Sequence, residues 1–462
     1  MVNRNTMEMV HPKMRERVMG DSIDIDKFTG MNDVADGGLF VAKNTAQPSA
    51  ILNADVDLEG AISKRSGKTL RVTLAGAHSI WAGNSCMLVA AGNALYKVVN
   101  HVATSVGTIS GPQSPMSYIE IDDLVYISNP YWNGVYNHAT GALSSWGISV
   151  PPGPVLLTTT GNMPAGVYNV CMTNLVSGEL SGNGQINSIT LDAVGGISIL
   201  NRPSGAIVWC TDCNEGIFYR IGPVDVIGEI STIEPLPSLF CSPPPYMTNL
   251  CHAFGLVWGS VGNVVYYSQP FQPSWFRLNM NRFIFGTEVV MIARTPTGLF
   301  IGTIEQTYFL AGTEPAKMEQ ILAGTGAIRG TLAYCNNVPA LNDILQTAEK
   351  GHQDVPIWRA QDGIVIGNAA GKLYNLSKNK LMMDSPSSGA SLYRNVDGTF
   401  QFLTSSARGL SGSSIGALNA ETLALFEAGK VSRAGFTQRG MGSTASFSDT
   451  ATVEVRRGGV LI

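Results

Sequence analysis

Residues 252–312 read HAFGLVWGSVGNVVYYSQPFQPSWFRLNMNRFIFGTEVVMIARTPTGLFIGTIEQTYFLAG, and they decide the fold class. Five short apolar runs lie in this stretch, at residues 255–258, 264–268, 289–293, 299–302 and 307–310. Turn-forming breaks separate the runs, at residues 259–262, at the proline-flanked segment 269–275 and at residues 295–298. Short runs rich in Val, Ile, Tyr and Phe between turn residues predict antiparallel strands. A unit of about four such strands is typical of a β-propeller blade, which is a small twisted sheet.

Weaker copies of this unit lie on both sides of the stretch, at residues 79–99, 117–136, 357–376 and 391–403. Each copy places turn residues between apolar runs, and these turns are Gly92-Asn93, Asp122-Asp123, Asn133-Gly134, Asp362-Gly363, Ala370-Gly371 and Asp397-Gly398. A D-G or N-G turn between two apolar runs is the strongest local signal of a β-hairpin. The intervals between the turns are irregular, so the sequence predicts an all-β fold built on a degenerate β-propeller.

The composition agrees with many short strands and weighs against several other classes of protein. The 462 residues include 51 glycines, and only 14% of them are charged, which suits tight turns better than helical bundles. A net charge of −4 weighs against a protein that holds nucleic acid through a basic surface. No apolar run reaches the roughly 18 residues of a membrane-spanning helix, and the charged N-terminus lacks the apolar core of a signal peptide. Seven cysteines, an odd number, do not form a disulfide framework, so we expect synthesis in a reducing cytoplasm.

Residues 151–235 break the rhythm of the predicted blades. PPGPVL at residues 151–156 opens this segment as a proline-stiffened linker. The pattern from Gly166 to Ser181, G-x-Y-x-h-x-h-T-x-x-x-x-G-E-x-S, resembles the central strands of fibronectin-type β-sandwiches. We therefore expect residues 151–235 to form an inserted β-sandwich, from which CSPPPY at residues 241–246 leads back to the propeller.

The rest of the chain divides around this insertion. We expect an N-terminal arm at residues 1–24, a hairpin segment at residues 25–74, the first blades at residues 75–150 and the remaining blades at residues 236–403. Within the hairpin segment, strands at residues 51–58 and 61–64 flank a turn at Glu59-Gly60. The Gly/Ser-rich segment 404–462 is expected to hold a short helix at residues 420–428, stopped by Gly429, and a terminal strand pair. We expect that pair to close or extend the propeller, by supplying a strand to the first blade.

Three stretches resemble bacteriophage short-tail hub or nozzle proteins, the group that includes packaged-DNA stabilisation proteins. The first lies near the N-terminus, and its matching residues are Phe28, Gly30, Asn32, Ala50, Asn53, Asp55, Gly60, Ile62, Arg65 and Gly67. The second covers residues 270–312, and the third covers residues 324–330 and WRAQDGIVI at residues 358–366. The matches follow the same order as in those proteins and extend over most of the chain.

The resemblance implies a structural virion protein without enzymatic activity or cofactors. Such a protein forms a ring, expected here as a homohexamer, below the portal and adaptor proteins of the tail. It surrounds the DNA exit channel, retains the packaged genome and anchors tail fibres, spikes or a needle. Double-stranded DNA passes through without sequence-specific contacts, and a near-neutral chain suits that passage. Two alternatives remain: a glycan- or receptor-binding propeller adhesin, and a hydrolase on a propeller scaffold.

Several motifs could carry chemistry, and each has a simpler structural explanation. SKRSGKT at residues 63–69 lacks the glycine that a P-loop needs five residues before Gly67, because that position is Ile62. Gly412-Ser413-Ser414-Ile415-Gly416 matches a nucleophile elbow, but no histidine follows it, since the last histidine is His352.

Cysteines and carboxylates give two further candidate sites. Cys210, Cys213, Cys241, Cys251 and His252 are of the types that bind zinc, but the spacing favours buried structural thiols. The pairs Asp122-Asp123 and Asp24/Asp26 could supply the two carboxylates of a glycoside hydrolase, although turns explain them as well. We expect neither a metal site nor catalysis.

Aromatic residues are the candidates for partner contacts. They are Tyr131, Trp132, Trp146, Tyr246, Trp275 and Phe276. Because blade cores are rich in aromatic side chains, we expect most of them to pack inside, with interface anchoring as the alternative.

Overall fold

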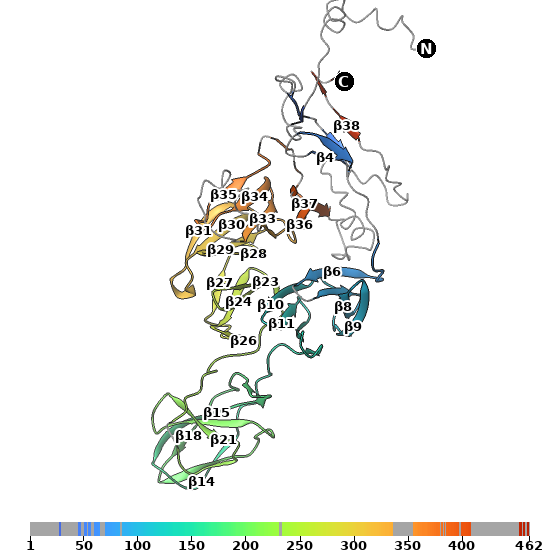
Figure 1. Cartoon of the computed structure of the whole chain (residues 1–462). Coiled ribbons are helices and arrows are strands. Elements are labelled where there is room, and N and C mark those ends of the chain that lie inside the picture. The colour runs from blue at the N-terminus through green and yellow to red at the C-terminus, as the bar shows by residue number, and fades with distance from the viewer. Residues whose placement is uncertain are drawn as a thin grey trace, which may run out of the picture.

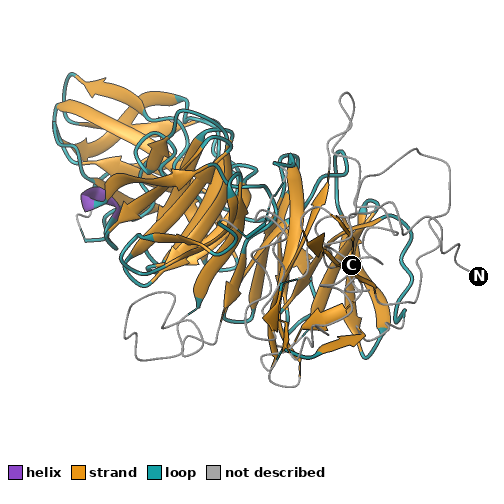
Figure 2. Cartoon of the chain, turned by 90° about the horizontal axis from the view of Figure 1, so that it is seen from above, coloured by secondary structure: helices purple, strands orange, loops and turns teal. Residues whose placement is uncertain are grey.

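The computed structural model describes residues 70–335 except 84–85 and 231–232, residues 354–407 except 379, 382, 384 and 397–398, and short segments between 27 and 64 and between 452 and 461. In these segments the chain is almost entirely β-structure, with one short 3-10 helix, η3 (Pro315–Lys317) (Figure 2). None of the helices in the described part is long and apolar enough to span a membrane. The predicted arm at residues 1–24, the helix at residues 420–428 and Asp24/Asp26 lie outside the described residues.

Five antiparallel sheets of blade size follow one another along the chain (Figure 1). The first two contain β6 (Ala77–Ala82), β7 (Met87–Ala91), β8 (Ala94–Val99) and β9 (Val102–Thr108), then β10 (Ser117–Ile121), β11 (Leu124–Ser128), β12 (Asn133–Asn137) and β13 (Leu143–Ser144). The third contains β23 (Thr248–Ala253), β24 (Leu256–Val261), β25 (Val264–Gln269), β26 (Gln272–Phe276) and β27 (Arg282–Ile284). The fourth and fifth contain β28 (Val289–Thr295), β29 (Gly298–Thr303), β30 (Gln306–Ala311) and β31 (Glu319–Thr325), then β32 (Ala333–Cys335), β33 (Val355–Ala360), β34 (Gly363–Gly367) and β35 (Leu373–Asn375). A hairpin of β36 (Ser388–Val396) and β37 (Thr399–Ala407) follows the fifth sheet.

Each sheet packs one face against the next sheet along the chain. Leu88 of the first sheet shares a core with Ile127 of the second, and Ile119 of the second shares a core with Val257 of the third. The remaining interfaces are built in the same way, by Trp258 with Ile292, Phe300 with Trp358, and Ile366 with Phe402. Successive small sheets packed face to face are the architecture of a β-propeller, so the predicted fold class is confirmed.

Between the second and third blades the chain forms the predicted β-sandwich. One sheet has the order β14 (Leu156–Met163), β19 (Gly195–Ile199), β22 (Val226–Ile227). The other has the order β18 (Asn187–Leu191), β15 (Gly166–Thr173), β20 (Ile207–Thr211), β21 (Phe218–Gly222). A small hairpin, β16 (Leu175–Val176) and β17 (Glu179–Leu180), extends beyond them. Figure 1 shows the sandwich as a separate body below the blades. Side chains of both sheets, such as Tyr168 and Ile197, fill its core.

A strand near the C-terminus pairs with the N-terminal segment and not with the first blade. β38 (Thr452–Glu454) is antiparallel to β3 (Ala50–Leu52), while β4 (Ala54–Val56) and β5 (Ile62–Lys64) form the expected hairpin. β39 (Arg456–Arg457) pairs with β40 (Val460–Leu461), and β1 (Lys27–Phe28) runs parallel to β2 (Thr45–Ala46). Because all four strands of the first blade pair among themselves, β38 adds to the segment that precedes that blade.

The predicted turn at Asn133-Gly134 is wrong, because both residues belong to β12. The turn lies four residues earlier, where the Asn129 side-chain oxygen accepts the backbone N–H groups of Tyr131 and Trp132 at 2.8 and 2.7 Å. An asparagine that bonds to its own following backbone makes such a turn without glycine. Gly134 instead makes room for a neighbouring ring, since a Cβ at this position would lie 2.5 Å from the Trp132 ring.

The proline-flanked segment 269–275 is also more ordered than predicted. It contains most of β26, which pairs with β25 through Ser268 and Phe276. The stretch 252–312 therefore covers parts of two blades, and the boundary between them falls at residues 285–288, after β27 and before β28.

The close approach of Trp132 gives a test of this packing. Gly134→Ala should lower the free energy of unfolding by about 1–3 kcal/mol, because the new methyl group overlaps a large ring that has little room to move. Urea denaturation followed by circular dichroism measures the loss. Gly216→Ala is the matched control, since a Cβ there meets nothing within 4 Å. Equal stability of the two variants would contradict the described contact.

Candidate functional site: a polar seam and a pocket at opposite ends of strand β23

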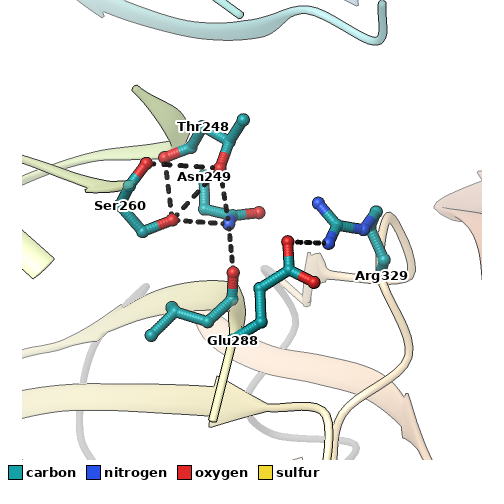
Figure 3. A network of polar contacts seen from close by, with 6 residues as sticks. Thr248, Asn249, Ser260, Glu288 and Arg329 are labelled. Atoms are coloured by element: carbon teal, nitrogen blue, oxygen red, sulfur yellow. Dashed lines mark hydrogen bonds and ion pairs between the residues drawn. The ribbon is translucent and has the colours of Figure 1, made fainter. Parts of the chain in front are cut away.

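A polar network joins the third and fourth blades where β23 begins (Figure 3). The side-chain amide of Asn249 donates to the Ser260 hydroxyl at 2.8 Å and to the Val289 carbonyl at 3.1 Å. Thr248 and Ser260 hydroxyls lie 3.1 Å apart, which links the first two strands of the blade. Asn249 has φ +54°, a left-handed conformation that asparagine tolerates better than most residues. This backbone conformation directs the side-chain amide of Asn249 toward the fourth blade.

The network continues toward the fifth blade through an ion pair. An Arg329 guanidinium nitrogen lies 2.6 Å from a Glu288 carboxylate oxygen, and Glu288 directly precedes β28 (Figure 3). The Arg329 carbonyl accepts the backbone N–H of Gly389 at 2.8 Å, at the start of the β36–β37 hairpin. Both side chains of the pair are partly exposed, so its net contribution is at most about 1 kcal/mol.

Serine hydroxyls make equivalent contacts between the earlier blades. The Ser79 hydroxyl accepts the backbone N–H of Met116 at 2.9 Å, between the first and second blades. The Ser117 and Ser128 hydroxyls accept the N–H groups of Leu250 and Met247 at 2.7 and 2.9 Å, between the second and third. We call this series of inter-blade contacts, from Ser79 to Arg329, the polar seam. It ties successive blades at the end where their first strands begin.

The sandwich is attached to the third blade at its edge strand, β26. The Trp275 indole N–H donates to the Leu180 carbonyl at 2.8 Å, and Arg277 Nε donates to the Leu239 carbonyl at 3.1 Å. Both donors come from the blade and both acceptors from the inserted segment or its exit. The backbone of the insertion is therefore held by blade side chains in addition to its two covalent connections.

The opposite end of β23 opens into a pocket of about 330 Å³. Its apolar wall consists of Ala253, the last residue of β23, and of Phe254 and Pro296, from the turns that follow β23 and β28. His252, Arg294, Thr295 and Asp354 supply the polar wall. We call this cavity the rim pocket.

An ion pair defines the polar wall of the rim pocket. Arg294 Nη2 lies 2.9 Å from Asp354 Oδ2, and the guanidinium stands over the Tyr334 ring at 5.7 Å from its centroid. The Tyr334 hydroxyl accepts the backbone N–H of Arg294 at 3.0 Å. Thr295 is occupied locally, because its hydroxyl donates to the Gly298 carbonyl at 2.9 Å.

Burial keeps the surrounding groups neutral near pH 7. Desolvation, with a smaller effect of the Arg294 charge, lowers the pKa of His252 below its usual value, while Asp122 acts in the opposite direction. Burial raises the pKa of Tyr334 well above its usual value and raises that of Cys251 to about 12. The Arg294–Asp354 pair thus brings one charge of each sign to a pocket whose other groups are uncharged.

Comparisons with known proteins give no family for the chain. No protein-family model and no curated protein matches the chain. Solved structures of similar fold include Sqt1 from Saccharomyces cerevisiae, with 11% identity, 64% of this chain and 94% of that chain covered, and a TM-score of 0.17. The WD40 domain of Pan2 from Neurospora crassa shares 9% identity over 65% of this chain and 79% of that chain, with a TM-score of 0.27. BBS1N, solved in complex with ARL6DN, shares 9% identity over 77% and 94% of the two chains, with a TM-score of 0.29.

The cysteines predicted as structural thiols lie in separate cores. Cys210 lies in the sandwich core and Cys251 in the core between the third and fourth blades, and both are buried free thiols. Cys241 is buried in the segment that leaves the sandwich, while Cys213 is only partly buried. Within the described segments, no three His, Cys, Asp or Glu side chains are grouped so that they could hold a metal ion.

The other motifs fall on turns or outside the described part of the chain. Asp122-Asp123 forms the turn between β10 and β11, as predicted, with Asp122 at φ +52°. Lys64 ends β5, whereas residues 65–69 and 412–416 lie outside the described residues.

The predicted aromatic residues divide between core and surface. Trp146 and Phe276 are buried together between the second and third blades, and Trp132 is partly buried against the core between the first and second. Trp275 bridges to the sandwich, while Tyr131 and Tyr246 are exposed. Core packing thus accounts for three of the six residues, fewer than the majority that was expected to pack inside.

Sequence reasoning missed both the seam and the pocket. Arg294 and Asp354 are 60 residues apart, so no local motif connects them. A recoverable signal exists for the seam, because Ser128 and Ser260 are hydroxyl residues at or next to the end of an apolar second strand. Both are at most 1% exposed.

Two substitutions at Asn249 separate its backbone role from its hydrogen bonds. Asn249→Gly keeps the left-handed backbone and removes the amide, so the free energy of unfolding should fall by about 1 kcal/mol. Asn249→Ala adds the cost of a left-handed alanine and should lose about 2–3 kcal/mol. Urea unfolding followed by tryptophan fluorescence compares the variants.

Asn100 gives the matched control, since it is exposed in the turn between β8 and β9 at φ +50°. Asn100→Gly should be close to neutral and Asn100→Ala should show the backbone cost alone. If Asn249→Gly were as stable as Asn100→Gly, the amide would contribute nothing to the seam.

Thiol reactivity tests the burial of the cysteines. A short pulse of N-ethylmaleimide at pH 8 should label Cys213 well before Cys210 and Cys251. Burial raises the pKa of each of the latter two to about 12, so only a minute fraction is thiolate at that pH. Mass spectrometry of the digested protein gives the order of labelling, and unfolding in urea should make the rates similar. Early labelling of Cys251 in the folded protein would contradict its described burial.

Proposed function

We propose that this chain is a structural, non-catalytic subunit of a short-tailed phage virion, a tail hub or nozzle protein. In this role, copies of the chain form a homohexameric ring around the DNA exit channel below the portal and adaptor proteins. The ring retains the packaged genome and anchors fibres, spikes or a needle.

The observation that carries the proposal is the combination of two firmly connected bodies in one chain. The propeller and the inserted sandwich have separate cores, and Trp275 and Arg277 of the blade hold the backbone of the insertion. A scaffold subunit needs such an arrangement, because one body can contact neighbouring subunits while the other reaches a different partner. Head-to-tail contacts between such subunits generate closed rings. The three stretches that resemble tail-hub proteins point to the same role.

The outward face of the three-stranded sheet supports a role in protein contacts. Leu157 and Val226 lie on that face across Ser198, and both are about half exposed, at 52% and 51%. Val155 and Leu200 continue the same face and are also exposed. Contiguous exposed aliphatic side chains are typical of interaction surfaces.

The charge of the chain is compatible with a channel through which DNA must slide. The net charge is −4, so the chain has no basic excess that would hold the phosphates of passing DNA. In the described part, several arginines are also paired with carboxylates, among them Arg202, Arg220 and Arg329.

Light scattering tests the proposal directly. We expect the purified chain to have the mass of a protomer and to form a closed ring when mixed with the portal–adaptor assembly of the same virus, because tail parts add in order onto a template. Electron microscopy of the mixture should show the ring below the adaptor. A chain that neither closes into a ring nor binds that assembly at micromolar concentration would overturn the proposal.

Immunogold labelling of intact virions provides an independent readout. Antibodies raised against the sandwich should label the tail, and labelling of the capsid alone would contradict the assignment to the tail.

A further inference from the structure

We propose that the rim pocket binds an uncharged saccharide unit. The inference depends on the chemistry of this pocket and is independent of the proposed role in the tail. The pocket lies at the C-terminal end of β23, and its volume of about 330 Å³ is at the lower limit of small-ligand sites, which suits one or two sugar rings.

The paired charges of the polar wall favour a neutral ligand. Arg294 and Asp354 compensate each other at 2.9 Å, so an anion would meet the carboxylate and a cation would meet the guanidinium. Either kind of ion would therefore be repelled by one member of the pair at short range. A ligand without net charge avoids this repulsion.

The same pair offers donors and acceptors to hydroxyl groups. A guanidinium carries five N–H donors, and a carboxylate has about four acceptor positions, whereas their mutual contact uses one nitrogen and one oxygen. His252, kept neutral by burial, adds one donor and one acceptor at the ring nitrogens. Hydroxyl groups both donate and accept, so a polyhydroxylated ring matches this wall.

The rest of the lining presents apolar surface to the C–H face of such a ring. Ala253, Phe254 and Pro296 supply it. Phe254 has φ +57°, an unusual backbone conformation for a bulky side chain, and conformations of this kind tend to occur at functional sites.

A second aromatic residue lies beside the turn that carries Phe254. Phe271 lies in the turn between β25 and β26, is 82% exposed and also has a positive φ, +56°. Its backbone N–H donates to the Gly255 carbonyl at 2.9 Å, and its ring lies so close to Gly255 that a Cβ there would be 2.9 Å away. Position 255 therefore favours glycine. The Phe271 ring packs over Gly255, which directly follows Phe254.

Saturation-transfer NMR on the full chain at pH 7 tests the proposal. The neutral probes are methyl glucoside, methyl galactoside, methyl mannoside and N-acetylglucosamine, and the charged probes are N-acetylneuraminic acid and glucosamine. We expect at least one neutral probe to receive saturation from the protein. Absence of signal from every neutral probe at millimolar concentration, or stronger binding of a charged probe, would overturn the proposal.

Two pairs of variants assign the signal to the rim pocket. Phe254→Gly removes the apolar wall at a position where glycine suits the backbone, and Phe240→Gly is its control, because Phe240 is exposed at φ +60° near the sandwich. Arg294→Gln removes the charged donor, and Arg220→Gln is its control, since Arg220 pairs with Glu234 on the sandwich. We expect the pocket variants to weaken binding at least tenfold and the controls to leave it unchanged.

Melting curves identify any variant that does not fold, and the two pocket variants are independent of each other. Binding that survives both pocket substitutions in folded protein, or that a control substitution removes equally, would show that the saccharide binds elsewhere and would overturn the assignment.

Discussion

The structure depends on one packing constraint: each small sheet has two apolar faces, and it can bury them only between its neighbours. β29 shows this most clearly, because all six of its residues are buried. Leu299 and Ile301 face the core shared with the third blade, whereas Phe300, between them, faces the core shared with the fifth. Alternation along a strand thus divides its side chains between two cores. A strand buried on both faces reads as a continuous apolar run, which is why this part of the sequence is easiest to interpret.

Apolar packing of this kind is non-directional, and the polar seam adds the direction that it lacks. Apolar contacts between two sheets allow one sheet to shift slightly along the other. A hydroxyl or amide that forms a hydrogen bond with the first strand of the next blade fixes the position of the two sheets relative to each other. Ser117, Ser128 and Asn249 do this around the start of β23. Ser128 is fully buried, so loss of its partner leaves it unsatisfied and costs more than the bond itself contributes, whereas Ser117 and Asn249 are partly buried. The seam therefore fixes how the blades are placed relative to one another, and this matters more than the few contacts that it adds between them.

The sequence allowed the fold class and most strands of the central stretch to be predicted, because their signals are local. Runs of Val, Ile and Phe between turns predicted β24, β25, β28, β29 and β30. The errors occurred where a distant group decides the local structure. Gly134 resembles a turn glycine but lies in a strand, where it makes room for Trp132. β26 contains a proline, which counts against a strand, yet it pairs with β25 at the edge of its sheet. The pairing of β38 with β3 joins residues about 400 positions apart. The rim pocket is formed by three segments that are far apart in the sequence. No local pattern encodes either feature.

The position of β23 explains how the chain can carry a large insertion and a small pocket on one blade. The backbone returning from the sandwich is bound at Met247, Asn249 and Leu250 before it continues into the sheet. His252 lies at the other end of the strand. Four residues of β23 lie between Thr248 and the pocket-lining Ala253, and two of them, Leu250 and Cys251, are fixed in different inter-blade cores. The strand that leads along the chain from the sandwich to the rim pocket is therefore packed against blades on both sides.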